Sequence, residues 1–200
     1  MLENKLGITN SLELEEAEER ISKTKAKEMF DKGYLDCLEV GTYKGLSDIH
    51  FHLFKDIYDF AGKLRHVNIA KGNLQFAPLR FLGVSLDHID KMTQHTFDEI
   101  IEKYVEMNIA HPFRDGNGRS TRIWLDLILK KELKMVVYWT LIKKEDYFSA
   151  MERSPINDIE IRNLIYHSLT DKIQDKDVFM KGIDVSYTYE GFTKYKTEDL

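Results

Sequence analysis

The chain has 200 residues, of which 42% are hydrophobic and 32% charged, and this balance excludes wholesale disorder. The 29 basic residues are outnumbered by 34 acidic ones, and the resulting net charge of −5 disfavours a protein that coats nucleic acid. The single cysteine, Cys37, excludes an intrachain disulfide and is typical of a reducing compartment.

Helical periodicity dominates the sequence. Asn10 and Glu13 resemble a capping box, and apolar residues at helical spacing continue from there to Gly33, a favourable stop. The expected helices cover residues 10–33, 48–60, 85–109, 118–131, 143–153, 158–169 and 185–196. No repeat and no linker rich in Gly, Ser or Pro divides the chain, so we expect a mainly α fold in one domain, residues 1–200. The residues after Gly191 are expected to be solvated and frayed.

One segment departs from the helical pattern. Apolar and polar residues alternate on both sides of Gly72-Asn73, from Val67 to Phe76, which predicts a short β-hairpin within residues 62–80. An exposed strand edge can bind an extended segment of another protein by strand addition. The hairpin is therefore a candidate docking element, and the alternative is an ordinary surface hairpin.

The sequence predicts a cytoplasmic protein that neither spans a membrane nor carries a signal peptide. No window approaches the ~18 consecutive apolar residues of a transmembrane helix. The first residues lead into an acidic run between Glu13 and Glu19, whereas a signal peptide has a basic segment followed by an apolar one.

The segment richest in chemistry is residues 111–122, His-Pro-Phe-Arg-Asp-Gly-Asn-Gly-Arg-Ser-Thr-Arg. Pro112 disfavours helical geometry at the preceding residue, so a helix should end at His111. The two glycines let the backbone approach a ligand closely, and Asn117 is a good N-cap for the helix that follows. A helix start with free N–H groups binds anions.

The side chains around this helix start suit a polyphosphate. Arg119 and Arg122 lie three residues apart, on one side of the first turn, and arginine binds phosphate through a planar fork of donors. Asp115 supplies a hard oxygen ligand of the kind that Mg²⁺ takes beside phosphates. His111 supplies a base that is neutral near pH 7. The segment predicts a polyphosphate site with a metal ligand and a general base, and the alternative is a plain connector between two helices.

Two familiar phosphate loops are excluded. The Walker pattern requires a lysine where this chain has Arg119, and a glycine where it has Phe113. The dinucleotide fingerprint requires a small residue where this chain has Thr121, and a preceding strand where the sequence predicts a helix.

Residues 111–122 match every fixed position of the signature of the Fic (filamentation induced by cAMP) family, His-Pro-Phe-x-Asp/Glu-Gly-Asn-Gly-Arg-x-x-Arg. The chain resembles this family from about Ser11 to Leu200, which implies a helical bundle with the hairpin as its flap beside the active-site loop. Fic enzymes typically transfer AMP from ATP to a hydroxyl of a target protein and release pyrophosphate. The resemblance therefore implies a protein adenylyltransferase that uses ATP and Mg²⁺.

The resemblance also implies roles for individual residues. His111 would deprotonate the incoming Ser, Thr or Tyr hydroxyl, and Asp115 would bind Mg²⁺. The implied nucleotide contacts are Gly116, Asn117, Gly118, Arg119, Ser120, Thr121 and Arg122, with Lys71 as a further contact. The implied target-docking residues of the flap are Ile69, Ala70, Lys71, Gly72 and Asn73. Relatives that act as kinases have Ala and Lys at the glycines and first arginine, so this sequence favours AMP transfer.

A second motif lies further along the chain. Ser186-x-x-x-Glu190-Gly191 resembles the inhibitory-helix motif of the Fic class in which this helix follows the catalytic core. The resemblance implies a helix over residues 185–196, seated with the help of Ser186, in which Glu190 pairs with Arg122 and removes a contact to the γ-phosphate. The alternative is an ordinary solvated glutamate. Tyr187 and Tyr189 are candidates for self-modification that would release the helix.

Three functions follow from these interpretations. The first is an autoinhibited adenylyltransferase, the second an enzyme of the same family that removes AMP with Glu190 positioning water, and the third a non-catalytic nucleotide or partner-binding module. Family analogy implies a target protein docked on the flap, with topoisomerase subunits among the family's targets, and a growth-arresting toxin as the biological role. A terminal inhibitory helix supported by a neighbouring subunit would imply a homo-oligomer. No direct contact with nucleic acid or membrane is expected.

Overall fold

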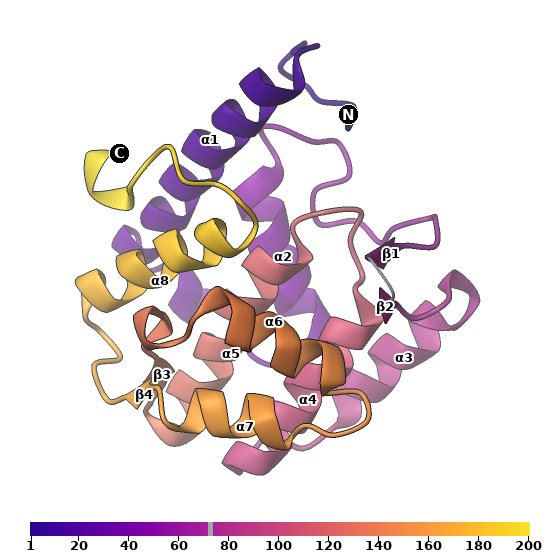
Figure 1. Cartoon of the computed structure of the whole chain (residues 1–200), viewed down its shortest axis with the longest axis vertical. Helices are drawn as coiled ribbons and strands as arrows, with labels where there is room; N and C mark the ends of the chain where they lie inside the picture. The colour runs from indigo at the N-terminus through magenta and orange to yellow at the C-terminus, as the bar shows by residue number, and fades with distance from the viewer. Residues whose placement is uncertain (72–73) are drawn as a thin grey trace.

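The computed structural model describes residues 1–71 and 74–200, with the backbone alone for residues 71, 74 and 75, and helices dominate it (Figure 1). The α-helices of the described residues are, in chain order, α1 (Ser11–Asp31), α2 (Tyr43–Phe54), α3 (Leu79–Lys91), α4 (Phe97–Ala110), α5 (Asn117–Leu133), α6 (Lys144–Arg153), α7 (Ile159–Tyr166) and α8 (Lys176–Tyr189). Two antiparallel strand pairs accompany them: β1 (Ala70–Lys71) with β2 (Leu74–Gln75), and β3 (Val136–Val137) with β4 (Leu169–Thr170). The mainly α fold class and the hairpin are confirmed.

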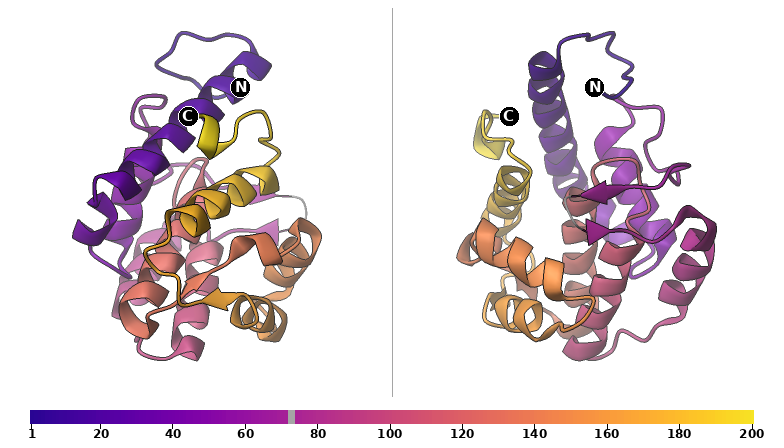
Figure 2. Two further views of the ribbon diagram at one scale, coloured as in Figure 1. Left: turned by 90° about the vertical axis from the view of Figure 1, so that its left-hand side faces the viewer. Right: turned by 45° about the vertical axis from the view of Figure 1, so that its right-hand side comes forward.

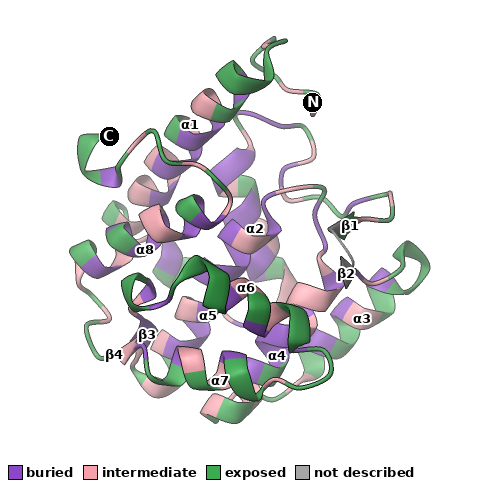
Figure 3. Ribbon diagram, viewed as in Figure 1, coloured by how far each residue is buried: buried purple, intermediate pink, exposed green. Residues whose placement is uncertain are grey.

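Helix α5 lies in the interior, packed between α2, α4 and α8. Its apolar residues, Trp124, Leu125, Ile128 and Leu129, are fully buried, and the buried positions gather around it (Figure 3). The Trp124 indole N–H also donates to Thr42 O at the start of α2, at 3.0 Å. Because burial of apolar surface is the main stabilising term in folding, this packing fixes α5 firmly, and the second half of the motif lies on its first turns.

Helices α1 and α8 come from opposite parts of the sequence but lie side by side on one flank of the molecule (Figures 1 and 2). Both pack near the first turns of α5, and they converge on the two arginines of the motif. Neighbours of the motif are therefore supplied by segments far from it in the sequence.

The helix expected over residues 85–109 is two helices, α3 and α4, separated at residues 92–96. The break is a capping box: the Glu99 amide donates to the Thr96 hydroxyl, at 3.3 Å, and the Thr96 amide donates to the Glu99 carboxylate, at 3.0 Å. Thr followed by Glu three residues later is a signature of a helix start, so the sequence carried a signal that periodicity alone overlooked.

Other expected boundaries also differ. Helix α2 begins before residue 48, because Thr42 caps it by accepting from the Gly45 amide at 3.1 Å, and it ends at Phe54. Helix α7 ends at Tyr166, and the residues beyond it pair as β4 with β3, a sheet that the sequence did not predict. A two-residue strand is too short for its alternation to stand out.

The range expected for the inhibitory helix, residues 185–196, also differs from the observed helix. Helix α8 starts at Lys176, where Asp175 caps it by accepting from the Asp177 and Val178 amides, and it ends at Tyr189. Gly191 then takes a φ of +97°, a left-handed conformation that glycine adopts without strain and that ends the helix. Among the described residues, no helix has the length and apolar character needed to cross a bilayer.

Candidate active site

His111 lies where α4 meets the flap. Helix α4 ends at Ala110, as Pro112 predicts, and His111 has the left-handed φ of 47° and ψ of 62°. Its amide still donates to Met107 O, at 3.1 Å, so its backbone belongs to the end of the helix. Its ring stacks on Phe76, which directly follows β2, with ring centroids 3.6 Å apart. The flap and the helix end thus fix the candidate base together.

The loop after His111 is fixed from within. Phe113 is fully buried, and the Asn117 side chain accepts from its amide at 2.8 Å and donates to its carbonyl at 2.9 Å. Gly116 has a φ of +74°, and a Cβ there would lie 2.5 Å from the Phe54 ring. The N-cap of α5 is Gly116 and not Asn117, which is the first helical residue and holds the loop through its side chain.

His50 on α2 supports this loop from beneath. Its Nδ1 accepts from the Gly62 amide at 2.9 Å, which leaves the ring proton on Nε2, and Nε2 donates to the Asp115 carbonyl at 2.8 Å. The ring also stacks on Phe113, with centroids 3.9 Å apart. Burial lowers the pKa of His50 to about 4, so the imidazole is neutral and its tautomer is fixed.

Asp115 presents a half-exposed carboxylate beside the start of α5. Its Oδ1 accepts from the Gly116 amide at 2.7 Å, and its Oδ2 lies 3.7 Å from Nη2 of Arg119. The side chain is therefore aimed by its own loop and by the first motif arginine, and it retains access to solvent.

Arg119 is buried and pairs with a carboxylate of α1. Its Nη1 donates to Glu18, which also accepts from the Tyr58 hydroxyl. Burial alone lowers the pKa of Arg119, but the carboxylates of Glu18 and Asp115 outweigh it and raise the pKa. The sequence assigned Arg119 to the triphosphate. It lines the cavity, but Glu18 already holds its charge, and no motif in the sequence marked Glu18.

Arg122 meets α8 instead. Its Nε donates to Ser186 Oγ at 2.7 Å, and its Nη2 donates to Ser186 O at 3.0 Å and to Glu190 Oε1 at 3.2 Å. The predicted contact between Arg122 and Glu190 is present. A Cβ at Gly118 would lie 2.7 Å from Glu190 Oε1, so this carboxylate lies against the first turn of α5.

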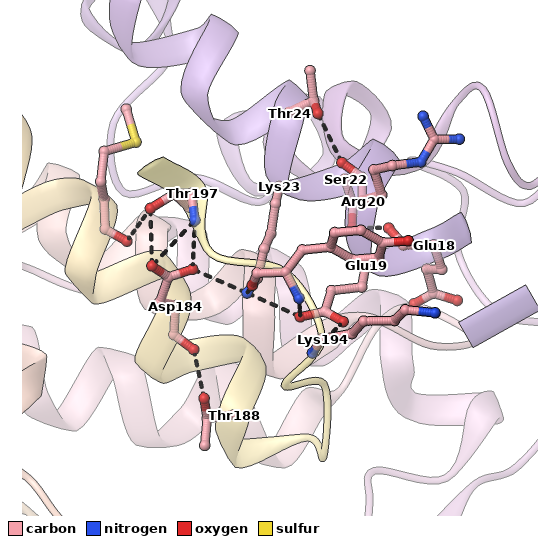
Figure 4. Close-up of polar contacts among 12 residues, drawn as sticks. Glu18, Glu19, Arg20, Ser22, Lys23, Thr24, Asp184, Thr188, Lys194 and Thr197 are labelled. Carbon is pink, nitrogen blue, oxygen red and sulfur yellow. Dashed lines mark hydrogen bonds and ion pairs between the residues drawn. The ribbon is translucent and has the colours of Figure 1, made fainter. Parts of the chain in front are cut away.

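A buried polar network holds α8 against α1 (Figure 4). Lys23 Nζ lies 3.0 Å from Glu19 and 2.9 Å from Asp184, and thereby joins the two helices. The residues after Gly191 add to the network: the Lys194 amide donates to Glu19 at 3.0 Å and the Thr197 amide to Asp184 at 3.1 Å. The expected exposure of this segment is present, since most of its residues are exposed, but the segment is not frayed, because its backbone amides donate to the Glu19 and Asp184 carboxylates.

The site residues open onto one cavity of about 710 Å³. The residues that line it include the motif residues His111, Asp115, Gly116, Asn117, Gly118, Arg119 and Arg122, together with Glu190. Apolar residues also line it, among them Ile69 and Ala70 from the flap and Tyr147, Phe148 and Met151 from α6. Apolar walls with a few convergent polar groups are typical of small-molecule sites. Sequence reasoning missed the α6 wall, because no spacing in α6 distinguishes it from a core helix.

Several predicted site residues lie elsewhere. Ser120 and Thr121 are buried within α5, where their hydroxyls donate to Gly116 O and Asn117 O, so they do not line the cavity. Gly72 and Asn73 fall outside the described residues, as does the side chain of Lys71.

Tyr187 and Tyr189 are both buried, with 1% and 4% exposure. Burial raises the pKa of Tyr187 to about 12, and the Tyr189 hydroxyl donates to Ile142 O at 2.7 Å. Neither hydroxyl is accessible for modification in this conformation, contrary to the sequence-based hypothesis.

Comparison with known proteins gives a family match. Residues 41–129 match the model of the Fic/DOC family. A probable protein adenylyltransferase of Sinorhizobium fredii is 27% identical over 82% of this chain and 91% of its own length. The probable protein adenylyltransferase Fic of Escherichia coli is 26% identical, over 88% of this chain and 91% of its own length. The protein adenylyltransferase VbhT of Bartonella schoenbuchensis is 28% identical over 84% of this chain but only 37% of its own length.

Solved structures share the fold. BepC from Bartonella tribocorum, solved with bound AMPPNP, has a TM-score of 0.69 at 19% identity, over 85% of this chain and 92% of that one. The Fic domain of a putative cell filamentation protein from Bartonella quintana, solved with bound ADP, has a TM-score of 0.70 at 21% identity, over 89% and 93%. The segment that matches the Fic/DOC family model, residues 41–129, runs from just before α2 through the flap and the whole motif into α5.

Proposed function

We propose that this protein is an autoinhibited adenylyltransferase that moves AMP from ATP to a hydroxyl of a target protein and releases pyrophosphate. The observation that carries the proposal is the shared cavity: a candidate base, a carboxylate and an arginine surround the anion-binding start of α5. The adenylyltransferase names of the relatives, and the nucleotides bound in the structural neighbours, support the same chemistry.

In the proposed reaction the side chains of the cavity act on three groups: the target hydroxyl, the α-phosphate and the leaving pyrophosphate. The target oxygen attacks the α-phosphorus, the bond from that phosphorus to the pyrophosphate oxygen breaks, and His111 accepts the hydroxyl proton. Such phosphorus chemistry depends mainly on positioning and on neutralising charge. The backbone at Gly116 and Gly118 and the Arg122 guanidinium supply the fixed positive potential for the phosphates.

The residues present fit a magnesium ion held partly by substrate. Asp115 is a half-exposed carboxylate beside the phosphate site, and Mg²⁺ is commonly bound by one or two carboxylates together with substrate phosphates. The described residues contain no cluster of three or more His, Cys, Asp or Glu, so the remaining ligands would be phosphate and water. When bound, the ion would neutralise charge on the leaving pyrophosphate.

Glu190 would act as the inhibitor. Its carboxylate takes the Arg122 donor that a phosphate would use, and it puts negative charge at the start of α5, where the triphosphate would lie. Like charges repel strongly in a partly buried site, so ATP would bind only in an unproductive position while α8 is in place. A displaced α8 would restore the site.

The flap would receive the target. Ile69 and Ala70 line the cavity, and the Phe76 ring lies on His111, so a segment paired with β1 would bring one hydroxyl near the base. The chemistry of the occupant is thus an extended protein segment that presents Ser, Thr or Tyr.

The proposed function is tested by transfer of label from ATP labelled in its α-phosphate, with Mg²⁺ and cell lysate. We expect Glu190→Gly to label protein about tenfold more than wild type and Glu190→Gly/His111→Ala to label none. Glu3→Gly is the matched control, because Glu3 is exposed and distant from the site in sequence. Equal, background labelling by wild type and Glu190→Gly would contradict the proposal. Loss of label from a pre-labelled target with wild type would favour the AMP-removing alternative.

A further inference from the structure

Arg65 is a buried cation that the proposed chemistry does not use. It lies between α2 and β1 and is 3% exposed. Its described hydrogen-bond acceptors are all backbone carbonyls, and burial lowers its pKa. A buried charge is costly unless it is well satisfied, so the position of these carbonyls indicates what Arg65 does.

The four carbonyls belong to three different segments. The Arg65 Nη1 donates to Val67 O at 2.8 Å, just before β1, and Nη2 donates to Ala77 O, just after β2. Nε donates to His111 O at 2.8 Å, and Nη2 also donates to Ala110 O at 3.2 Å. One guanidinium therefore joins both arms of the flap to the end of α4.

The end of α4 needs such a partner. The last carbonyls of a helix have no hydrogen-bond donor within the helix, and they carry the negative end of the helix dipole. A guanidinium offers five donors in a rigid plane and can serve several carbonyls at once, whereas a lysine ammonium is a single point charge. Backbone bonds reinforce the junction: the Arg65 amide donates to Pro112 O at 2.8 Å and the Ala77 amide to Ile109 O at 2.9 Å.

We propose that Arg65 is a positioning residue that fixes the flap relative to His111, so that a hydroxyl docked on the flap meets the base. The inference rests on the proposed function. Arg65 would touch neither nucleotide nor target. It would act through the His111 backbone and through Phe76, whose ring lies 3.6 Å from the His111 ring and whose neighbour Ala77 is bonded to Arg65.

This role predicts a separation of binding from transfer. Arg65 contacts neither the start of α5 nor Arg122, so Arg65→Lys in a Glu190→Gly background should leave the affinity for the ATP analogue AMPPNP unchanged. Transfer of labelled AMP to lysate protein should fall about 100-fold, because a shift of about 1 Å between reacting groups is that costly. Arg80→Lys is the matched control, since Arg80 is exposed on the neighbouring α3.

Amide hydrogen exchange tests the same role without activity. Arg65→Lys should speed exchange at Phe76 and Ala77 about tenfold and leave Ile128 and Leu129 in α5 unchanged. If the amides of Phe76 and Ala77 exchange as slowly in Arg65→Lys as in the Glu190→Gly parent, the inference is overturned. It is also overturned if Arg65→Lys transfers AMP as well as the parent, or if weaker AMPPNP binding accounts for all of the lost transfer.

The two proposals fail in different ways. If the Glu190→Gly parent transfers no AMP, the proposed function is wrong, and the exchange rates still decide whether Arg65 ties the flap to α4. If the parent transfers AMP and Arg65→Lys does so equally, only the role of Arg65 is wrong.

Discussion

The two motif arginines are equally buried one turn apart on α5, yet they differ in what holds them. Arg119 is held by Glu18 of α1, whose side chain is 5% exposed, while Arg122 is held by Glu190 after α8, whose side chain is 21% exposed at the cavity. Phe54, Tyr187 and Phe192 surround the Arg119 guanidinium.

Neither carboxylate lies within residues 41–129, where the family model matches. The motif alone therefore does not determine which arginine is available to a substrate. Under the proposed function its neighbours do: Glu18 of α1 is a permanent partner of Arg119, and Glu190, directly after α8, is a removable partner of Arg122.

The largest expected effect is on stability and concerns the permanent partner. Glu18→Ala leaves the Arg119 charge and the Tyr58 hydroxyl buried without their acceptor, and we expect a loss of about 3–5 kcal/mol in the free energy of unfolding. Glu190→Ala should cost only about 1 kcal/mol, because the pair is partly exposed and Arg122 keeps Ser186. Urea unfolding at neutral pH measures both, and equal losses would remove the distinction.

His50, the buried support of the motif loop, should make the free energy of unfolding depend on pH. Its pKa falls from 6.5 to about 4 on folding, so below pH 6.5 the unfolded state binds a proton that the folded state does not. Stability should therefore fall as the pH drops from 6.5 towards 4, by about 3 kcal/mol for this shift. Urea unfolding against pH checks the slope. His50→Gln should flatten it, whereas His66→Gln, at an exposed position, should not.

Ser186 offers a second way to weaken the contact between α8 and Arg122. Ser186→Ala deletes the acceptor of Arg122 Nε, at a cost of about 1 kcal/mol, and loosens α8 next to Glu190. We expect a modest rise in AMP transfer, smaller than that of Glu190→Gly. Thr188→Ala is the control, because Thr188 is exposed on the same helix and its hydroxyl donates to Asp184 O, one turn earlier in α8. A rise with the control variant as large as with Ser186→Ala would mean that general loosening, and not Arg122, is responsible.

The smallest expected effect concerns the two buried tyrosines of α8. Tyr187→Phe/Tyr189→Phe in the Glu190→Gly background should leave self-labelling unchanged, since neither hydroxyl reaches the cavity. Mass spectrometry of the labelled protein checks the modified position. Adenylylated Tyr187 or Tyr189 would show that α8 leaves its place far enough to expose them.

The sequence predicted those parts of the site that lie close together in the chain. The helix end before Pro112, the left-handed freedom at Gly116 and the helix start with its arginines all follow from local chemistry. The pairing of Glu190 with Arg122 came from family resemblance. The Glu18–Arg119 pair spans 101 positions and depends on how α1 packs, which no local pattern encodes.

The same reason explains the errors in the fold. Periodicity carried the predicted helix across residues 92–96, where the competing signal was a single capping box. The polar side chains after Gly191 indicated a solvated segment. The contacts that hold this segment are made by its backbone amides, which donate to Glu19 and Asp184 and leave no signal in the side-chain pattern.

The most direct test compares the two carboxylates in one assay. Transfer from ATP labelled in the α-phosphate is measured for wild type, Glu190→Gly and Glu18→Gln, corrected for the folded fraction, with γ-labelled ATP in parallel. We expect a gain of about tenfold for Glu190→Gly alone, with label from the α-phosphate only. A similar gain with Glu18→Gln, no gain with Glu190→Gly, or transfer of the γ-phosphate would contradict this expectation.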